Sequence, residues 1–259
     1  MDYSEHFRKE EHPFIEQVRD WKQAVETYYE TKLTDFLDPR EQDLLAMIIG
    51  KDETVRFQFH GGANGAERRR ACIYPFYEEI TEESFHLALY ELSYPAKFVT
   101  LRHPDILGTL TGLGIKREKY GDIIAGEGFF HCVVSEEVSL YLEMNLTKAG
   151  NAPVQVERKP LQDALEAEES WEEVSSTITS FRLDVLIAEM YGVSRSKALP
   201  YIEKEKVKVN WKTITQPAYQ VAPGDYVSVR GMGRRKILSN EGLTKKGRYR
   251  LQYGKKKDQ

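Results

Sequence analysis

The feature that most constrains the fold is the segment from residue 183 to 209, where the spacing of apolar residues changes from helical to strand-like. Four apolar residues stand at i, i+3, i+4 and i+7, one face of a short helix: Leu183, Leu186, Ile187 and Met190. Gly192 can end this helix, and Ser194 can cap a second one. The alternation of KVKV then predicts a strand in which Val207 and Val209 point inward and Lys206 and Lys208 point outward. The segment therefore predicts two short helices beside a sheet.

Cations accompany this segment and continue beyond it. A later strand, YVSVR, follows a PGD turn at residues 223–225 and precedes GMGRRK. The cations lie at the start of the second helix, along the first strand and after the last one: Arg195, Lys197, Lys206, Lys208, Lys212, Arg230, Arg234, Arg235 and Lys236. We expect them to converge on one side of the folded segment.

Charge is segregated along the chain, although the net charge is only -4. Residues 181–259 hold 18 Lys and Arg against 7 Asp and Glu, a balance of +11. The preceding 180 residues hold 19 and 34, a balance of -15. A basic block next to an acidic one is typical of a module that binds nucleic acid or another anionic surface.

The first part of the chain predicts helices, a strand and a turn. Apolar residues at spacings of three, four and seven predict a helix over residues 5–29. Asp38 can cap a second helix that has Pro39 at its first position and ends at Gly50. A strand follows at residues 55–60, and HGGANGA predicts a tight turn because no GK[ST] follows its glycines. The next element opens on three adjacent arginines, Arg68, Arg69 and Arg70, which either hold phosphates or form a solvated face.

The middle of the chain predicts a βαββαβ order. FHLALYEL and KFVTLR read as strands, residues 104–113 as a helix, GDIIA and FFHCVVS as paired strands, and EEVSLYLEMNL and PVQVERK as a helix and a last strand. This order indicates a ferredoxin-like fold, the architecture that RNA-recognition motifs share. Phe129 and Phe130 are neighbours and so point to opposite faces, which favours core packing over base stacking. Lys116, Arg117 and Lys119 follow the first helix and either contact phosphate or remain solvated.

Two breaks divide the chain. Residues 161–173 hold six carboxylates and no cation, followed by SSTITS, which predicts a short acidic helix and a linker; residues 75–83 mark an earlier break. The predicted fold class is α+β with three small domains. They are a helical α/β N-terminal domain at 1–78, a ferredoxin-like, RRM-like domain at 79–160, and a basic domain at 181–259 behind an acidic linker at 161–180.

Other classes of protein find little support. The longest apolar run is far too short to span a membrane, and the charged N-terminus does not resemble a signal peptide, so we expect a cytoplasmic protein without membrane insertion. Cys72 and Cys132 stand alone, which argues against a zinc site or a disulfide framework. The six histidines show no metal-ligand spacing. We therefore expect no metal and no cofactor.

The basic domain carries a resemblance. RLD at 182–184, SRSKA at 194–198, VKVN at 207–210 and PGD at 223–225 are similar to the αL RNA-binding motif, the domain first described in ribosomal protein S-four. Glu205 and Trp211 stand where the motif usually has glycine, and Pro200 falls inside the second helix. The RNA-binding residues that charge and resemblance together predict are Arg182, Asp184, Ser194, Arg195, Ser196, Lys197, Lys206, Lys208, Asn210, Trp211, Lys212, Arg234 and Arg235. A second RNA contact is predicted at Arg68, Arg69, Arg70, Lys116, Arg117 and Lys119.

The resemblance extends over the whole chain. KLTDFLDPREQ, GGANGAERRRA, FVTLRHPDILGTLTGLGIKREKYGDI and the acidic linker are together similar to the YlmH family, whose members are bacterial RNA-binding proteins encoded near cell-division genes. The resemblance implies binding to rRNA and tRNA on the large ribosomal subunit when it carries a stalled peptidyl-tRNA. It further implies work with ribosome quality-control factors in tailing of the nascent chain.

The chemistry favours binding over catalysis. Asp184 lies in FRLDVLIAEM, which lacks the pattern of a pseudouridine-synthase aspartate, and no HIGH-like or KMSKS-like segment of a tyrosyl-tRNA synthetase occurs. We expect Asp184 to orient Arg182 or a backbone amide, Asn210 to serve a turn or a ribose hydroxyl, and Trp211 to stack on a base or pack on the sheet. Two alternatives remain: an RNA-modifying enzyme with its site in residues 1–160, and a protein scaffold linked to cell division.

Overall fold

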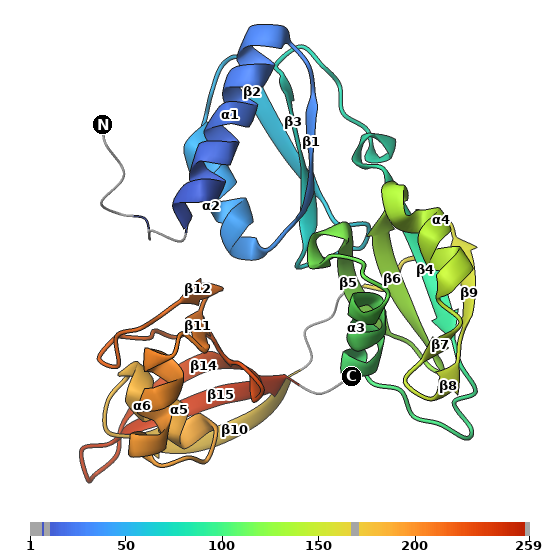
Figure 1. Ribbon diagram of the computed structural model, residues 1–259. Coiled ribbons are helices and arrows are strands. Elements are labelled where there is room, and N and C mark those ends of the chain that lie inside the picture. The colour runs from blue at the N-terminus through green and yellow to red at the C-terminus, as the bar shows by residue number, and fades with distance from the viewer. Residues whose placement is uncertain (1–6, 8–10, 167–170, 257–259) are drawn as a thin grey trace. The chain divides into compact units, whose positions relative to one another are not determined.

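The computed structural model describes residues 7, 11–166 and 171–256 and divides the chain into two compact units, 1–168 and 169–258. The first unit holds a three-stranded and a four-stranded sheet, with a small two-stranded ladder, and the second holds one six-stranded sheet (Figure 1). Within the described ranges, no helix has both the length and the apolar character that crossing a bilayer requires.

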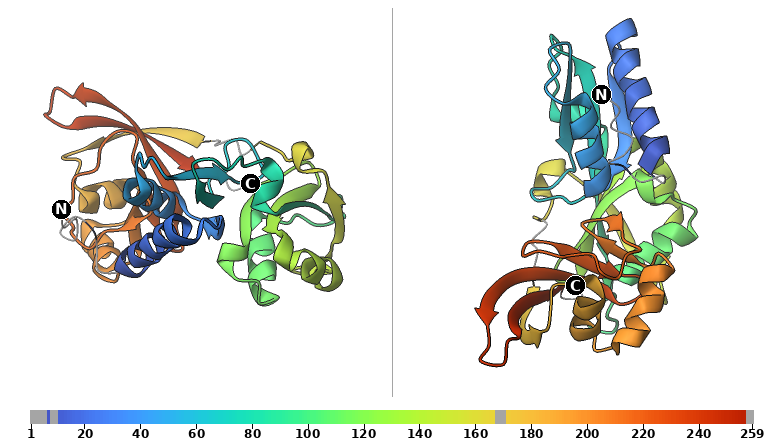
Figure 2. Two further views of the ribbon diagram at one scale, coloured as in Figure 1. Left: turned by 90° about the horizontal axis from the view of Figure 1, so that it is seen from above. Right: turned by 90° about the vertical axis from the view of Figure 1, so that its left-hand side faces the viewer.

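Two helices and three strands form the N-terminal part of the first unit. They are α1 (His12–Tyr28), β1 (Lys32–Leu37), α2 (Pro39–Ile49), β2 (Val55–His60) and β3 (Arg69–Pro75). The sheet is antiparallel with the order β1-β3-β2. Apolar residues of α1 and α2, Val18, Val25, Leu45 and Ile49, pack with Val55 and Ile73 of the sheet in one core, so both helices cover the same face (Figure 2).

The local signals of this part are partly confirmed. Asp38 forms a full capping box with Glu41 at the start of α2, and Gly50 ends the helix with a positive φ of 63°. The first helix begins at His12, later than predicted, because Pro13 is tolerated only in a first turn. Phe7 lies outside α1, and the rest of its predicted start, residues 5, 6 and 8–10, lies outside the described residues.

The central part of the first unit has the predicted ferredoxin-like topology. Its elements are the short 3-10 turn η3 (Glu82–Phe85), β4 (Leu87–Ser93), α3 (His103–Gly112), η4 (Arg117–Lys119), β5 (Tyr120–Ala125), β6 (Phe129–Ser135), α4 (Glu136–Asn145), β7 (Lys148–Ala149), β8 (Ala152–Pro153), β9 (Gln155–Lys159) and η5 (Leu161–Asp163). The main strands are antiparallel with the order β5-β6-β4-β9. Numbered within this fold, the order is 2-3-1-4, which places the first and third strands in the centre.

One predicted strand of this part is wrong. KFVTLR, residues 97–102, forms a turn and an extended approach to α3, with the N–H groups of Phe98 and Val99 donating to the carbonyl of Pro95. Phe98 is 88% exposed, whereas Leu101 is buried and Val99 packs against the core, so only part of the apolar content that suggested a strand is buried. The opposite orientation of Phe129 and Phe130 is confirmed, since only Phe130 enters the core.

The second unit places two helices on one face of a six-stranded sheet (Figure 1). Its elements are β10 (Trp171–Ile178), α5 (Leu183–Met190), α6 (Arg195–Glu203), β11 (Val207–Val209), β12 (Lys212–Thr213), β13 (Tyr226–Val229), β14 (Gly233–Leu243) and β15 (Tyr249–Lys256). The strand order is β10-β15-β14-β13-β11-β12, with antiparallel neighbours throughout. The ends of β14 and β15 form a hairpin that projects from the sheet (Figure 2).

The helical stripe and the strand alternation predicted for residues 183–209 are confirmed. Leu183, Leu186, Ile187 and Met190 are at most 2% exposed, as are Val207 and Val209, and all six share one core. Pro200 lies inside α6 on its exposed side, and the helix continues to Glu203.

Residues 171–178 correct the predicted acidic helix and linker. They form β10, which pairs along its whole length with β15 and places Ile178 in the core at 1% exposure. Residues 167–170 of the same stretch lie outside the described residues. The acidic side chains Glu172 and Glu173 are exposed on the strand, so the carboxylates that suggested a linker are solvated while Val174 and Ile178 pack inward.

Candidate nucleic-acid interface

A single buried carboxylate holds two arginines at the start of the two helices of the second unit. Asp184, 2% exposed, accepts hydrogen bonds at 3.1 Å from both Nε and Nη2 of Arg182. It also accepts a hydrogen bond from Nε of Arg195 at 2.8 Å and forms an ion pair with Nη2 of the same residue at 2.7 Å. The backbone N–H of Val185 donates a fourth hydrogen bond at 3.0 Å. We call Arg182, Asp184 and Arg195 the arginine clasp.

The clasp fixes the arginines while leaving part of each in solvent. The side chains of Arg182 and Arg195 are 37% and 56% exposed. Burial raises the pKa of Asp184, but the hydrogen bonds from the two guanidinium groups outweigh burial and hold this pKa below its usual value. The clasp thus keeps a net charge of +1 and presents planar donors at fixed positions, which suits phosphate oxygens. Asp184 itself, predicted among the RNA-binding residues, is buried and fully bonded, so it orients the arginines, in line with the role expected for it.

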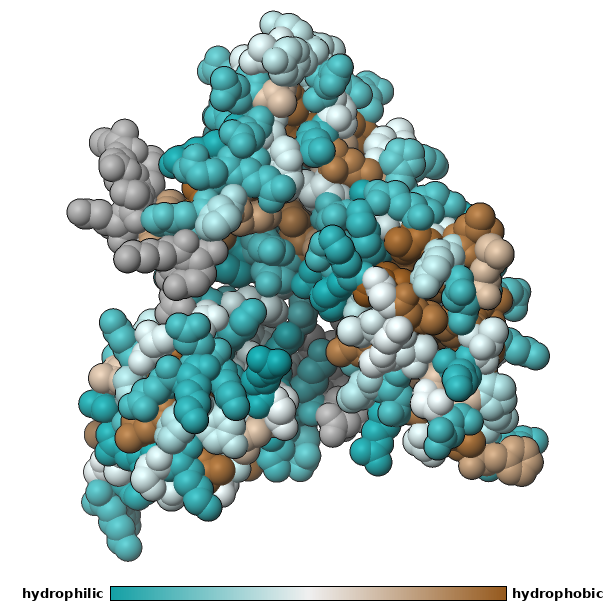
Figure 3. All heavy atoms as spheres, viewed as in Figure 1, coloured by the Kyte–Doolittle hydropathy of each residue, from teal (hydrophilic) through white to brown (hydrophobic). Residues whose placement is uncertain are grey.

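The first turn of α6 adds further donors beside the clasp. The Ser194 side chain accepts a hydrogen bond from the backbone N–H of Lys197, which confirms the predicted cap, and its hydroxyl lies 2.9 Å from that of Ser196. Arg195, Ser196 and Lys197 are all exposed here. A helix N-terminus carries a partial positive charge, so the dipole and the cations favour the same anion. Hydrophilic side chains predominate around α5 and α6 on the face shown in Figure 3, with apolar residues between them.

The remaining cations do not converge on the same side, which corrects the sequence prediction. On β11, Lys208 points away from the face covered by the helices because Val207 and Val209 point toward it. Arg234 and Arg235 are neighbours on β14 and therefore lie on opposite faces. The register places Arg234 beside Ser228 and Arg235 beside the buried Val227. The cations thus form one group at the helix starts and another on the opposite face of the sheet, while Arg235 lies over the ring of Tyr191, at the end of α5.

Lys206 and Lys212 complete the predicted set. Lys206 is exposed in the loop before β11, where its carbonyl accepts a hydrogen bond from the N–H of Arg230. Lys212 is half-buried on β12 and pairs with Val209.

Asn210 serves the turn, one of its two predicted roles. Its Nδ2 donates to Oδ1 of Asp225 at 2.7 Å, and its Oδ1 accepts from the backbone N–H of Tyr226 at 2.8 Å. These bonds join the turn after β11 to the PGD turn. Glu205 and Trp211, which stand at the usual glycine positions of the motif, adopt positive φ values of 57° and 62°. The turn geometry is therefore kept, at a conformational cost that glycine would avoid.

Trp211 lies on the face of the sheet opposite the helices. Its ring centroid is 5.2 Å from that of Tyr226, and the guanidinium of Arg234 lies 5.0 Å from it. The Trp211 side chain is partly exposed, so it packs on the sheet and remains accessible from solvent.

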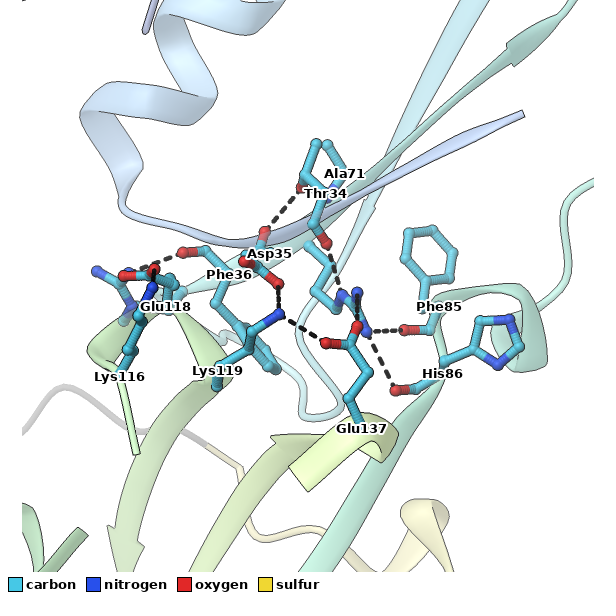
Figure 4. Close-up of polar contacts among 12 residues, drawn as sticks. Thr34, Asp35, Phe36, Ala71, Phe85, His86, Lys116, Glu118, Lys119 and Glu137 are labelled. Atoms are coloured by element: carbon cyan, nitrogen blue, oxygen red, sulfur yellow. Dashed lines mark hydrogen bonds and ion pairs between the residues drawn. The ribbon is translucent and has the colours of Figure 1, made fainter. Parts of the chain in front are cut away.

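Of the second predicted RNA contact, one residue is internal, which corrects the prediction for that residue. Arg70 is 2% exposed and donates to the carbonyls of Thr34, Phe85 and His86 at 2.6, 3.1 and 3.3 Å. Lys119 lies between Asp35 and Glu137, with Nζ 2.7 and 2.6 Å from their carboxylates (Figure 4). These bonds tie the N-terminal sheet to the central part of the unit. These bonds form because a charged donor that is shielded from water needs hydrogen-bond or ion-pair partners within the protein.

The other four cations of this set are also mostly engaged. Arg68 donates to the carbonyl of Phe36, and Arg69 to Gln42. Arg117 is exposed but donates to the carbonyl of Tyr120 and stacks on its ring. Lys116 is exposed, with 76% of its side chain in solvent and Glu118 at 3.9 Å (Figure 4). Arg68, Arg69 and Lys119 are partly exposed, so solvent reaches every residue of the predicted patch except the buried Arg70.

The described residues show no cluster of three or more His, Cys, Asp or Glu side chains that could hold a metal ion. Cys72 and Cys132 are fully buried, and burial raises the pKa of Cys72 to about 11 and that of Cys132 to about 12. Both thiols are thus protonated at neutral pH and act as small core residues.

Comparison with known proteins shows which family the chain belongs to. The chain is 40% identical over 256 residues to the "Ribosome-associated protein quality control protein P2" of Bacillus subtilis, covering 99% of both chains. It also resembles a solved structure, "Cell division protein ylmH from Streptococcus pneumoniae", with 30% identity, a TM-score of 0.54, and coverage of 62% of this chain and 98% of that one. The chain belongs to the YlmH family.

Two parts of this YlmH-family chain match domain families. Residues 81–163 match the family described as "Putative RNA-binding domain in YlmH", and residues 181–227 match the S4 domain. The "Small ribosomal subunit protein uS4" of Pseudomonas entomophila is 44% identical over 50 residues, 19% of this chain and 24% of that protein. The S4 match contains the arginine clasp, α6 and the Asn210 turn, and ends before β14 and β15.

Proposed function

We propose that the chain binds RNA of the large ribosomal subunit, without catalysis, through the arginine clasp and the first turn of α6. The observation that carries the proposal is the clasp itself: one buried carboxylate fixes two partly exposed guanidinium groups beside the exposed Lys197. Phosphates positioned there meet fixed donors, a helix N-terminus and a net positive charge.

The partners follow from the family. The Bacillus subtilis relative is named for ribosome-associated quality control. We therefore extend the proposal to rRNA and peptidyl-tRNA on a stalled large subunit, to quality-control factors that tail the nascent chain, and to the cytoplasm as the place of action.

The test is co-sedimentation with isolated large ribosomal subunits at moderate salt. The double variant Arg195→Ala/Lys197→Ala is expected to bind about tenfold or more weakly, because it removes two phosphate contacts that release counterions. Lys245→Ala/Lys246→Ala is the matched control, since it removes two exposed cations from the β14–β15 hairpin of the same unit. Equal binding of wild type and the clasp variant would overturn the proposal.

A second candidate, a protein scaffold for cell division, is favoured by the name of the Streptococcus pneumoniae relative. Pull-downs from cell extract before and after nuclease treatment separate the two candidates. RNA binding predicts that nuclease releases the captured partners, whereas a scaffold keeps them.

A further inference from the structure

The face of the C-terminal sheet opposite α5 and α6, here called the outer face, carries aromatic rings and cations together. Residues paired directly across antiparallel strands share a face. Lys208 pairs with Ser228 and Ser228 with Arg234, while Tyr226 pairs with Lys236, and Lys236 and Glu173 both pair with Gly254. The other face holds Val207, Val227 and Ile237, which are buried under the helices.

Three aromatic rings form a row on the outer face. The ring centroid of Tyr226 is 6.0 Å from that of Trp171 and 5.2 Å from that of Trp211, with interplanar angles of 48° and 47°. All three side chains are partly exposed. The row crosses the sheet from β10, at one edge, to the turn between β11 and β12 at the other.

Gly254 makes room for this row. A Cβ built at Gly254 would lie 2.8 Å from Cβ and 3.0 Å from Cγ of Trp171, closer than side chains tolerate. Trp171 therefore occupies the space over β15 that a side chain would fill. The absence of a side chain there lets the indole lie against the sheet beside Tyr226.

Cations lie against the same rings. The guanidinium of Arg234 is 5.0 Å from the Trp211 centroid, and Nζ of Lys236 is 4.7 Å from that of Tyr226 and 6.0 Å from that of Trp171. Lys208 and Lys256 are exposed on this face, and Glu173 is its acidic neighbour on β10. Positive charge thus exceeds negative charge around the three rings.

We propose that this outer face binds unpaired RNA bases, which stack on Trp171, Tyr226 and Trp211, while Lys208, Arg234 and Lys236 contact the adjoining phosphates. Aromatic platforms inside a basic groove recognise single strands, because every base offers a ring face and every nucleotide a phosphate. A duplex covers its base faces by stacking and so cannot use the rings. The inference rests on the proposed RNA-binding function and adds a second surface, distinct from the arginine clasp.

Intrinsic fluorescence of the intact chain provides the test. The chain has three tryptophans, Trp21, Trp171 and Trp211, two of which lie in the row. A twelve-nucleotide oligouridine is expected to quench the fluorescence of wild type and, by a larger fraction, that of Trp21→Phe, which keeps only the two tryptophans of the row. An RNA duplex of equal length is expected to quench both far less. Tyr226→Leu and Trp211→Leu are each expected to weaken oligouridine binding about tenfold, since each removes one aromatic ring on which a base stacks.

Lys208→Gln is a second variant that leaves the core untouched, because Lys208 is exposed. It is expected to weaken oligouridine binding about threefold at low salt and to leave the quenching at saturation unchanged. Wild-type affinity and quenching in Tyr226→Leu or Lys208→Gln would overturn the inference. Failure of the proposed function is a separate result, because it appears as normal binding of Arg195→Ala/Lys197→Ala to large subunits.

Discussion

Asp184 is the residue on which the geometry of the candidate interface depends. Its carboxylate accepts four hydrogen bonds, three of them from the guanidinium groups of Arg182 and Arg195, and forms a further ion pair with Nη2 of Arg195. Because the pKa of Asp184 is lower in the folded chain than in the unfolded chain, its contribution to stability is complete above the unfolded value of about 4. That contribution is lost as the pH falls through the lowered folded value.

Asp184→Asn is therefore expected to lower the free energy of unfolding at pH 7 by about 2 kcal/mol, the contribution of hydrogen bonds to a charged group. The difference from wild type should shrink as the pH falls below about 4, because the carboxylate of the unfolded chain then takes up a proton while that of the folded chain stays ionised down to its lowered pKa. Chemical denaturation followed by tryptophan fluorescence at several pH values measures both quantities. Glu203→Gln, at an exposed position of α6, is the control and should change stability by less than about 0.5 kcal/mol. A difference independent of pH would contradict the assignment.

Glu205 is strained at a position where the αL motif usually has glycine. Its φ is 57°, and a residue with a Cβ in this region costs about 1 kcal/mol. Glu205→Gly is expected to raise the free energy of unfolding by about 0.5–1 kcal/mol. The same substitution at Glu203, two residues earlier and inside α6, should lower it by about 1 kcal/mol. Chemical denaturation of the two variants measures both changes in the free energy of unfolding. If both substitutions destabilise the protein, Glu205 is not strained.

At the scale of elements, β10 is the strand that completes the C-terminal sheet. It forms one edge of the sheet and pairs with β15 over eight residues, from Trp171 to Ile178. Val174 and Ile178 contact the core beneath α5. The S4 match begins only at residue 181, so β10, β14 and β15 extend the sheet beyond the matched segment.

Ile178→Ala is expected to lower the stability of the second unit by about 3 kcal/mol, because it leaves a cavity in the core. Glu172→Ala, at an exposed position of the same strand, should cost less than about 0.5 kcal/mol. Urea denaturation followed by the fluorescence of Trp171 and Trp211 in a Trp21→Phe background reports on this unit. Equal, small effects of both substitutions would mean that residues 171–178 do act as a linker.

Local signals predicted the elements that local residues determine. The apolar stripe of α5, the Asp38 cap and the order of the central sheet could be predicted because spacing and capping are encoded within a few residues. β10 could not, since its ladder partner lies about 75 residues away and its carboxylates resemble those of a linker. The extra strand at residues 97–102 was predicted from apolar content alone, although Pro95 and Pro104 bracket it.

In the candidate site, too, only the features that neighbouring residues determine could be predicted from the sequence. The roles of Asp184, Ser194 and Asn210 follow from residue chemistry near a turn or helix start, and the structure places each in that role. The burial of Arg70 could not be predicted, because RRR has no pattern to show which arginine faces the interior. Only the pairing of β3 with β1 and its contact with the central part enclose Arg70.

At the scale of the whole molecule, charge follows the division into units. Residues 169–258 hold 18 Lys and Arg against 10 Asp and Glu, whereas the whole chain has a net charge of -4. Among the described residues, each hydrophobic core is built from one unit. A chain of this kind is repelled by RNA on average and attracted through one unit, so affinity should depend on where a cation lies.

Salt dependence tests this directly. The logarithm of the association constant for large ribosomal subunits should fall linearly with the logarithm of salt concentration, with a slope of about 0.7–0.9 per phosphate contacted. Arg195→Ala/Lys197→Ala should reduce that slope by about 1.5, because two contacts are lost. Lys51→Ala/Lys97→Ala removes two exposed cations from the first unit, both outside the predicted RNA contacts, and changes the net charge equally, from -4 to -6. If the position of a cation determines its effect on binding, this control variant keeps the wild-type slope. The slope is measured by co-sedimentation at graded concentrations of potassium chloride and constant magnesium. If both variants lose slope equally, net charge alone controls binding and the clasp has no special role.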